Sequence, residues 1–347
     1  RPAYDLKQSY RWNYENAPDP VEADIPVVPG DWSFCGLPVP SPLGMPAGPL
    51  LNGKWILYYA SLGFDVLTYK TVRSGVRDCY PLPNLVPIET RQLRGGESEL
   101  PELTDMRGSW AVSFGMPSSA PDLWRADIEE TRSKLAPEKL LSVSVVGTVQ
   151  PNWTIDDLAA DYAQCARWAC ESGANAIEAN FSCPNVSTCD GQLYQQPEDA
   201  AIVAEAVREA VGPTPFIIKI GHVDAESDAV ALLDAVSRFA DSLAMTNSVA
   251  ASVRGTGREL LFDGQKRGIC GAATFEASLR QTRLFARLLK SRNESLTIIG
   301  VGGAATADHV RQYLSAGAEC VHVATAAMAN PGVGLEIRRE LSRSHDE

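Results

Sequence analysis

The amino-acid sequence predicts an α/β fold in which eight parallel strands close into a (β/α)8 TIM barrel. From about Leu43 onward, short β-rich runs alternate with helical runs, which is the pattern of a parallel sheet whose strands are joined by helices. The chain has 347 residues, a length that fits either two ordinary domains or one large barrel. The number of candidate strands favours the barrel: Leu43–Ala47, Phe64–Lys70, Leu141–Gly147, Ala176–Ser182, Phe216–Ile220, Leu243–Asn247, Thr297–Val301 and Cys320–Thr325.

Helical periodicity separates these strands. In Ile155–Ser172, apolar residues recur at intervals of three and four positions. Thr154 can cap the start of this helix, with Asp157 three residues on, and Gly173 can end it. The same reasoning predicts helices over Pro197–Val211, Ala225–Ala240, Phe275–Lys290 and Ala307–Ala316.

Two regions fall outside the alternation. Residues 1–40 are rich in Trp, Tyr and Pro but sparse in periodic apolar residues, so we expect an N-terminal arm lying over a barrel made of residues 41–347. The stretch Ser74–Ser109 is long, interrupted by Gly and Pro, and acidic in its middle. We expect a functional loop there, because loops of this length in compact domains usually serve a function. It also follows the second strand, on the face where barrel enzymes keep their chemistry.

Composition and charge narrow the possible functions. The hydrophobic share of 45% and the charged share of 21% are those of a folded globular protein. Lys and Arg number 31 against 43 Asp and Glu, and the resulting net charge of −12 argues against nucleic acid as a partner. No apolar run approaches the roughly 20 residues that span a bilayer. Since the first residues are also polar, we expect a cytoplasmic protein that does not bind a membrane.

One of the eight cysteines has a suggestive position. The cysteines include no CxxC pair and only four histidines are present, so no metal site is expected. Cys183, however, lies in the run Asn180–Asn185 (NFSCPN), where a barrel strand passes into its loop beside the expected active-site mouth. In the alternative interpretation, Cys183 is a small hydrophobic residue buried in the core, as most cysteines are. The flanking Asn180 and Asn185 favour a site, because amides are costly to bury without partners.

Two lysines lie at the ends of predicted strands. Lys70 ends the second strand and Lys219 lies at the end of the fifth. A lysine inside a barrel is expensive unless it meets an anion or an electron-rich ring. Together with Asn180, Asn247 and Ser248 at other strand ends, the two lysines would line one polar pocket. In the alternative, both lysines extend to solvent from frayed strand ends.

Glycine-rich turns follow the last strands. Gly300–Gly303 comes after the seventh strand and Ala324–Thr325 after the eighth, where barrels commonly bind phosphate through backbone N–H groups. Gly268–Gly271 is another glycine-containing run at which the backbone can come close to a ligand. A phosphate site, two lysines, several amides and one thiol suit FMN, because a lysine can stabilise negative charge on the reduced ring while a thiol exchanges a substrate proton.

These motifs resemble those of dihydroorotate dehydrogenase. The resemblance covers about Leu43 to Glu340, and Cys183 is similar to the base of the soluble class 1 enzymes, since the membrane-associated class uses serine. It implies a (β/α)8 barrel, bound FMN, and oxidation of a dihydropyrimidine in pyrimidine biosynthesis with Cys183 as base. The matching motifs are LTYKT around Lys70, NFSCPN at Asn180–Asn185, IIKI at Lys219, TNS at Thr246–Ser248, IIGVGG at Ile298–Gly303 and VATA at Val323–Ala326.

The resemblance also implies roles for single residues. Lys70, Lys219 and Cys183 would take part in catalysis. The FMN contacts would be Gly48, Lys70, Thr71, Asn180, Lys219, Ser248, Gly271, Gly302, Gly303, Ala324 and Thr325. The substrate contacts would be Lys70, Asn180, Asn185, Asn247 and the backbone of Phe114, Gly115 and Met116.

One position departs from the family pattern. Where the family usually has an Asn that hydrogen-bonds the orotate ring, this chain has Val112. Either a neighbour such as Ser113, or a residue of Ser74–Ser109, replaces that bond, or the natural substrate is a different dihydropyrimidine.

Other readings of the same motifs stay open. A dihydrouridine synthase also has a Cys-Pro motif in a flavin barrel, although the net charge of −12 counts against it. A flavin-binding protein without dehydrogenase activity is a third possibility. The resemblance implies a homodimer that passes electrons to a soluble acceptor, either fumarate or another small oxidant, or a separate electron-transfer subunit.

Overall fold

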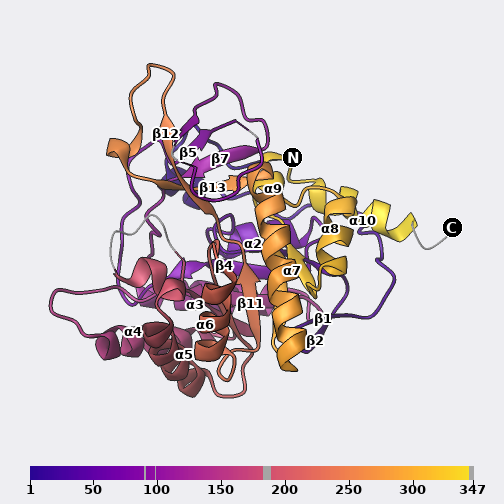
Figure 1. Cartoon of the computed structure of the whole chain (residues 1–347). Helices are drawn as coiled ribbons and strands as arrows, with labels where there is room; N and C mark the ends of the chain where they lie inside the picture. Colours follow the sequence, from indigo (N-terminus) through magenta and orange to yellow (C-terminus); the bar gives the residue numbers. More distant parts are fainter. Residues whose placement is uncertain (90, 98, 183–188, 344–347) are drawn as a thin grey trace.

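The computed structural model describes residues 1–89, 91–97, 99–182 and 189–343 (Figure 1). Eight parallel strands form a closed barrel in the order β10-β11-β14-β15-β3-β4-β8-β9, which confirms the predicted fold. Strands that follow one another along the chain are therefore neighbours in the barrel. They are β3 (Leu43–Met45), β4 (Val66–Val72), β8 (Leu140–Val145), β9 (Ala176–Asn180), β10 (Phe216–Lys219), β11 (Ser242–Met245), β14 (Thr297–Val301) and β15 (Cys320–His322).

All eight predicted strands are present, and their bounds differ from the prediction by a few residues. The strand over Thr297–Val301 has the predicted bounds. The eighth strand ends at His322 and not at Thr325, because Thr325 already begins the short helix α9 (Thr325–Ala329). Ala324 is therefore the residue before α9, and Thr325 is the first residue of that helix.

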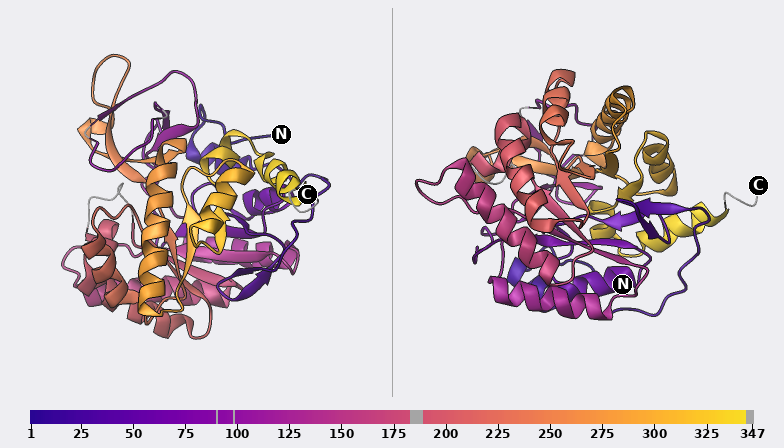
Figure 2. Two further views of the ribbon diagram at one scale, coloured as in Figure 1. Left: turned by 45° about the vertical axis from the view of Figure 1, so that its right-hand side comes forward. Right: turned by 90° about the horizontal axis from the view of Figure 1, so that it is seen from below.

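Helices cover the outside of the barrel strands, as both views in Figure 2 show. The five predicted helices are confirmed with small shifts at their ends: α4 (Ile155–Glu171), α5 (Pro197–Val211), α6 (Glu226–Val236), α7 (Phe275–Arg292) and α8 (Ala307–Ser315). At the start of α4, the Thr154 hydroxyl accepts a bond from the Asp157 amide while the Asp157 carboxylate accepts one from the Thr154 amide. Helices that were not predicted include α2 (Gly53–Ala60), α3 (Pro121–Lys134) and α10 (Val333–Arg343).

Residues 1–40 contact both ends of the barrel. They contain the helix α1 (Tyr10–Glu15) and a hairpin of β1 (Trp32–Phe34) and β2 (Leu37–Val39). In the hairpin, the buried Phe34 and Val39 pack against the first residues of the barrel strands. This cluster closes the barrel near the amino ends of most of its strands and also contains Val66, Leu140, Ala176, Ile217, Ala244, Ile299, Val301 and Cys320.

The stretch Ser74–Ser109 is not simply a loop, and the prediction is corrected on this point. It contains β5 (Leu85–Pro87) and β6 (Glu99–Pro101), which belong to a separate five-stranded sheet in the order β5-β7-β13-β12-β6. This sheet lies above the barrel strands in Figure 1. Strands of three residues carry too little periodicity to be recognised, and their partners are distant in the sequence: β7 (Ser109–Val112), β12 (Val249–Arg254) and β13 (Arg267–Gly271).

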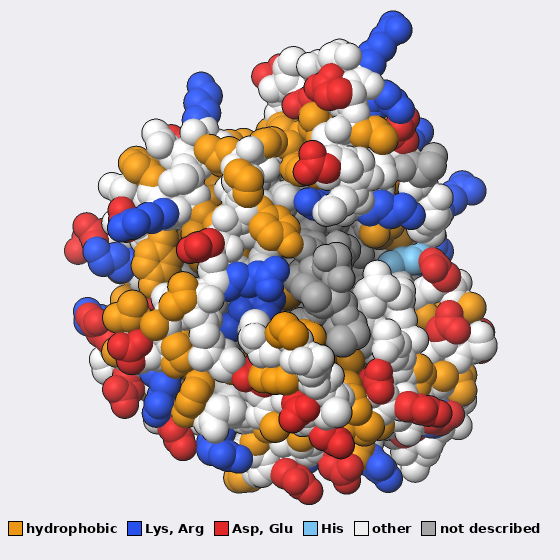
Figure 3. All heavy atoms as spheres, turned by 90° about the vertical axis from the view of Figure 1, so that its left-hand side faces the viewer, with side chains coloured by type: hydrophobic (Ala, Val, Ile, Leu, Met, Phe, Trp, Pro, Cys, Tyr) orange, Lys and Arg blue, Asp and Glu red, His pale blue; other side chains and the backbone are white. Residues whose placement is uncertain are grey.

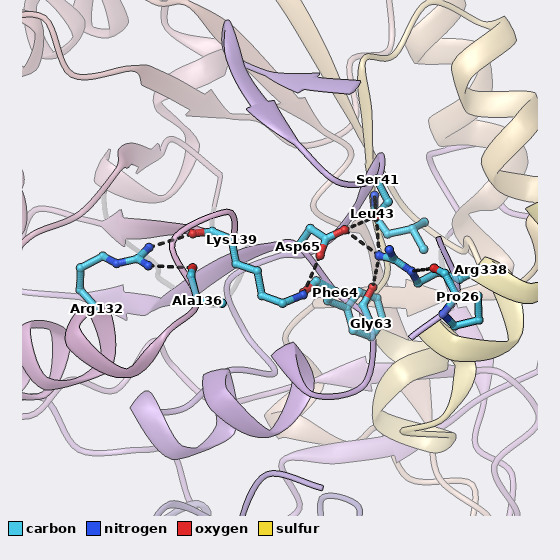
Figure 4. A network of polar contacts seen from close by, with 10 residues as sticks. All are labelled: Pro26, Ser41, Leu43, Gly63, Phe64, Asp65, Arg132, Ala136, Lys139 and Arg338. Atoms are coloured by element: carbon cyan, nitrogen blue, oxygen red, sulfur yellow. Dashed lines mark hydrogen bonds and ion pairs between the residues drawn. The ribbon is translucent and has the colours of Figure 1, made fainter. Parts of the chain in front are cut away.

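A buried network joins the two ends of the chain to the barrel. The Asp65 carboxylate accepts hydrogen bonds from Lys139 Nζ at 2.6 Å and from Arg338 Nη1 at 2.6 Å (Figure 4). Arg338 also donates to the Pro26 carbonyl and to the Ser41 hydroxyl. The C-terminal helix α10 is therefore tied to residues 1–40 and to the segment before β4.

The surface carries both signs of charge. Acidic and basic side chains are interspersed over the face that Figure 3 shows, so the described residues of this face form no continuous basic area. In the part of the chain that the structure describes, no helix is both long and apolar enough to cross a bilayer.

Candidate active site

A pocket opens at the carboxyl ends of the barrel strands, between the barrel and the five-stranded sheet. It brings together residues from all the motifs singled out in the sequence, which lie up to 277 positions apart between Gly48 and Thr325. The predicted residues that line it are Gly48, Lys70, Thr71, Phe114, Met116, Asn180, Lys219, Asn247, Ser248, Gly271, Gly302, Gly303, Ala324 and Thr325.

Three predicted residues are not among those that line the pocket. Cys183 and Asn185 lie outside the described residues. Gly115 lies beside the pocket with φ of +73°, and a Cβ on it would come within 2.6 Å of the Tyr80 ring. Glycine is therefore required there by the backbone and by Tyr80, and its neighbours Phe114 and Met116 reach the pocket.

The two lysines lie at the floor and at one side of the pocket. Lys219 is 2% exposed, and its Nζ lies 3.8 Å from Oε1 of Glu178 on the neighbouring strand. Lys70 is 6% exposed, with Nζ 5.7 Å from the centre of the Phe114 ring and 5.9 Å from that of Tyr10. The lysines are thus buried at the site and do not extend to solvent.

Two amides are held in fixed orientations. Asn180 accepts a hydrogen bond from the Ser182 amide at 3.0 Å, and its Nδ2 lies 3.4 Å from the Met116 sulfur. Asn247 donates to the Ser182 carbonyl at 3.1 Å. Because the protein itself orients these side chains, the pocket presents polar groups that need no rearrangement to meet a ligand.

Glycines bring the backbone close to the pocket on the side of strands β14 and β15. At Gly303, φ is +68° and a Cβ would lie 2.7 Å from Cβ of Phe275 and 2.9 Å from the Gly271 carbonyl oxygen. At Gly271, φ is +97° and a Cβ would lie 2.2 Å from the Gly108 carbonyl oxygen. Side chains are excluded at both positions, so the wall of the pocket here is backbone.

Val112 lines the pocket, as expected from its place beside Phe114. Its neighbour Ser113 does not reach the pocket, because its buried hydroxyl accepts a hydrogen bond from Arg267 Nε at 2.9 Å. Ser113 is therefore excluded as the substitute for the missing amide.

Several residues of the pocket were not predicted. Trp110, Cys270 and Met328 line it; Cys270 lies within the run Gly268–Gly271, which was singled out for its glycines, whereas no local motif distinguishes Trp110 and Met328. Cys270 is a thiol near Lys219, and burial raises its pKa to about 11 although Lys219 lowers it somewhat. Cys270 therefore stays protonated near neutral pH and is a poor base.

Comparisons with known proteins agree with this geometry. The chain is 31% identical to dihydroorotate dehydrogenase of Dictyostelium discoideum over 97% of this chain and 96% of that protein. It is 34% identical to the catalytic subunit of dihydroorotate dehydrogenase B (NAD(+)) of Shouchella clausii, over 49% of this chain and 54% of that protein.

A solved structure supports the fold. The crystal structure of DHODH from Eimeria tenella in complex with ferulenol has a TM-score of 0.73 at 18% identity, covering 97% of this chain and 89% of that one. Residues 31–344 match the family described as Dihydroorotate dehydrogenase. With the barrel, the pocket and these matches in agreement, the chain belongs to the dihydroorotate dehydrogenase family.

Proposed function

We propose that this chain binds FMN and oxidises dihydroorotate to orotate. Membership of the family supports the reaction. The observation that carries the proposal is the meeting, in one pocket, of the buried Lys70 and Lys219 with a backbone wall at Gly271 and Gly303. Cations suit a ring that gains negative charge on reduction, and a glycine turn suits a phosphate.

The residues present fit FMN without rearrangement of a side chain at the phosphate end. There, only backbone closes the pocket, because a Cβ at Gly303 or Gly271 would clash with its neighbours. FMN, when bound, supplies a ring that accepts a hydride. The residues proposed to hold it are Gly48, Lys70, Thr71, Asn180, Lys219, Ser248, Gly271, Gly302, Gly303, Ala324 and Thr325.

For the substrate, we assign recognition to the polar side of the pocket. Asn180 and Asn247 would donate hydrogen bonds to ring carbonyls or to the carboxylate, together with Lys70 and Asn185. The backbone of Phe114–Met116 would border the ring. Cys183 would take the proton that leaves the substrate carbon, since Cys270 stays protonated near neutral pH.

The acceptor, the assembly and the division of the chain belong to the same proposal. Electrons would pass to fumarate or to a separate electron-transfer subunit, and the protein would act as a homodimer. Residues 41–347 would form the FMN-binding barrel and residues 1–40 an arm over it. The contact of Tyr10 with Lys70 supports the arm's place at the pocket.

The direct test is reduction of the bound cofactor. We expect the purified protein to be yellow, and the flavin absorbance to bleach on anaerobic addition of dihydroorotate. A colourless protein that fails to bind FMN on titration contradicts the cofactor. If the protein is yellow and its flavin is bleached by another dihydropyrimidine but not by dihydroorotate, the substrate assignment is wrong. The assignment of an FMN-dependent dehydrogenase then still stands.

The assigned base is tested by replacing its thiol. Cys183→Ala should keep FMN and lose on the order of 10²–10⁴ in the rate of flavin reduction, the usual cost of removing a general base. Cys270→Ala is the matched control, because it removes a thiol that lines the pocket and stays protonated, and its rate should fall far less. Equal losses in the two variants would leave Cys183 without a special role.

A further inference from the structure

A layer of polar side chains lies inside the barrel, directly below the pocket. The cluster that closes the amino end of the barrel contains Val66, Leu140, Ala176, Ile217 and Cys320. Side chains two positions apart on a strand point to the same side, so the residues two positions later also face the barrel interior. On these five strands that residue is polar and buried: Thr68, Ser142, Glu178, Lys219 and His322; on β14, where the cluster contributes Ile299, it is the apolar Val301.

This polar layer contains one pair of charged side chains. Lys219 Nζ and Glu178 Oε1 are 3.8 Å apart, and the two residues are 2% and 1% exposed. Burial and the nearby Lys219 lower the pKa of His322 to about 3, so its ring is neutral near pH 7. Thr68 and Ser142 carry no charge. Within the polar layer, Glu178 is therefore the one group that can balance the ammonium of Lys219.

Glu178 acts on Lys219 from outside the pocket. Lys219 lines the pocket, and Glu178 is not among the lining residues. A separation of 3.8 Å is longer than a hydrogen bond, so Glu178 acts through its charge and leaves the donors of Lys219 for a ligand. Between buried groups this interaction is only weakly screened by solvent.

We propose that Glu178 is a positioning residue for Lys219. Its carboxylate holds the Lys219 ammonium at the floor of the pocket and sets how strongly that ammonium favours negative charge on the reduced cofactor. The inference rests on the proposed binding of FMN. The carboxylate offsets part of the field of Lys219, so its removal leaves the pocket more positive. The electron-rich, reduced cofactor is then more stable relative to the oxidised one.

The test is the midpoint potential of bound FMN, measured in the holoenzyme against a reference dye. In Glu178→Gln we expect the equilibrium for two-electron reduction to shift toward reduced FMN by about tenfold, which is about 30 mV upward. Ser142→Ala is the matched control, because it removes a buried polar atom of the same layer without changing the charge. Its equilibrium should change by less than twofold.

The outcomes separate this inference from the proposed function. A change of less than threefold in Glu178→Gln, a downward shift, or an equal shift in Ser142→Ala overturns it, while FMN bound to the wild type still supports the proposed function. If Glu178→Gln does not fold, Glu178→Asp carries the test. In that variant the carboxylate is one methylene farther from Lys219, so we expect the equilibrium for FMN reduction to shift toward reduced FMN by at least twofold. An unchanged equilibrium overturns the inference.

Discussion

Val112 stands where the sequence motifs predict an amide, and its position in the pocket makes it a candidate for substrate specificity. Ser113 is bonded to Arg267, so it does not provide the missing hydrogen bond. A valine facing a polar ring edge leaves that edge unpaired, and one such bond contributes roughly 0.5–1.5 kcal/mol.

We predict that Val112→Asn lowers the KM for dihydroorotate by up to about tenfold, the factor that corresponds to that energy. Val112→Ala is the control, because it changes the bulk of the side chain without adding an amide, and it should bring no such gain. The measurement compares dihydroorotate with dihydrouracil in all three proteins. Efficient oxidation of dihydroorotate by the wild type, with no gain in Val112→Asn, would show that the pocket compensates for the valine.

His322 shows how a buried imidazole makes stability depend on pH. The ring lies 6.0 Å from that of Phe34, and Gly44 leaves space for it, since a Cβ there would lie 2.4 Å from Cδ2 of His322. Burial lowers its pKa from 6.5 to about 3. Below pH 6.5 the unfolded chain binds a proton that the folded protein does not, so acid favours unfolding.

We predict that the free energy of unfolding falls between pH 6.5 and about pH 3, with His322 contributing up to ~1.4 kcal/mol per pH unit. Above pH 6.5 this contribution is constant. His322→Gln removes the titrating group, so its stability should fall less steeply over the same range. Denaturant unfolding at several pH values measures both slopes, and equal slopes would contradict the lowered pKa.

The hairpin of β1 and β2 is the element that closes the barrel below the polar layer. Phe34 is fully buried among the first residues of the barrel strands and stacks on His322. Two strands of three residues have little stability by themselves, so the hairpin is held mainly by this buried side chain.

We predict that Phe34→Ala lowers the free energy of unfolding by about 3–5 kcal/mol, because it leaves a cavity at the centre of a packed cluster. Ser33→Ala, at an exposed position of the same strand, should change it by no more than about 0.5 kcal/mol. Denaturant titrations of both variants provide the comparison. A small loss in Phe34→Ala would mean that the hairpin is not needed to close the barrel.

The whole molecule is joined through Asp65, which lies just before β4 and meets side chains from two distant parts of the chain. Lys139 precedes β8, and Arg338 comes from the last helix (Figure 4). All three are buried, so solvent does not replace a partner that is lost.

We predict that Asp65→Asn lowers the free energy of unfolding by about 3–5 kcal/mol, since it leaves two buried cations without their common carboxylate. Arg287→Gln is the control, because it breaks the exposed pair with Glu226 and should have little effect. The melting temperatures of the two variants, measured by thermal unfolding beside the wild type, make the comparison. Equal melting temperatures for Asp65→Asn and the wild type would show that the network contributes nothing to stability.

The sequence by itself determined the barrel, the position of its strands and most of the pocket. Buried parallel strands are short apolar runs bounded by helical periodicity, so Thr297–Val301 is recognisable from local residues alone. Lys70 and Lys219 were predictable for a similar reason, because a charge inside such a run stands out. Gly302 and Gly303, proposed to bind the phosphate, come just after the end of β14 and are equally local.

Only the tertiary structure decided which distant segments meet. The five-stranded sheet pairs β6 with β12 and β7 with β13, across more than a hundred residues. Cys270 reaches the pocket through that sheet, and Glu178 faces Lys219 through barrel closure. The physical reason is that periodicity and capping act between residues a few positions apart, whereas strand pairing and buried charge depend on residues that only folding brings into contact.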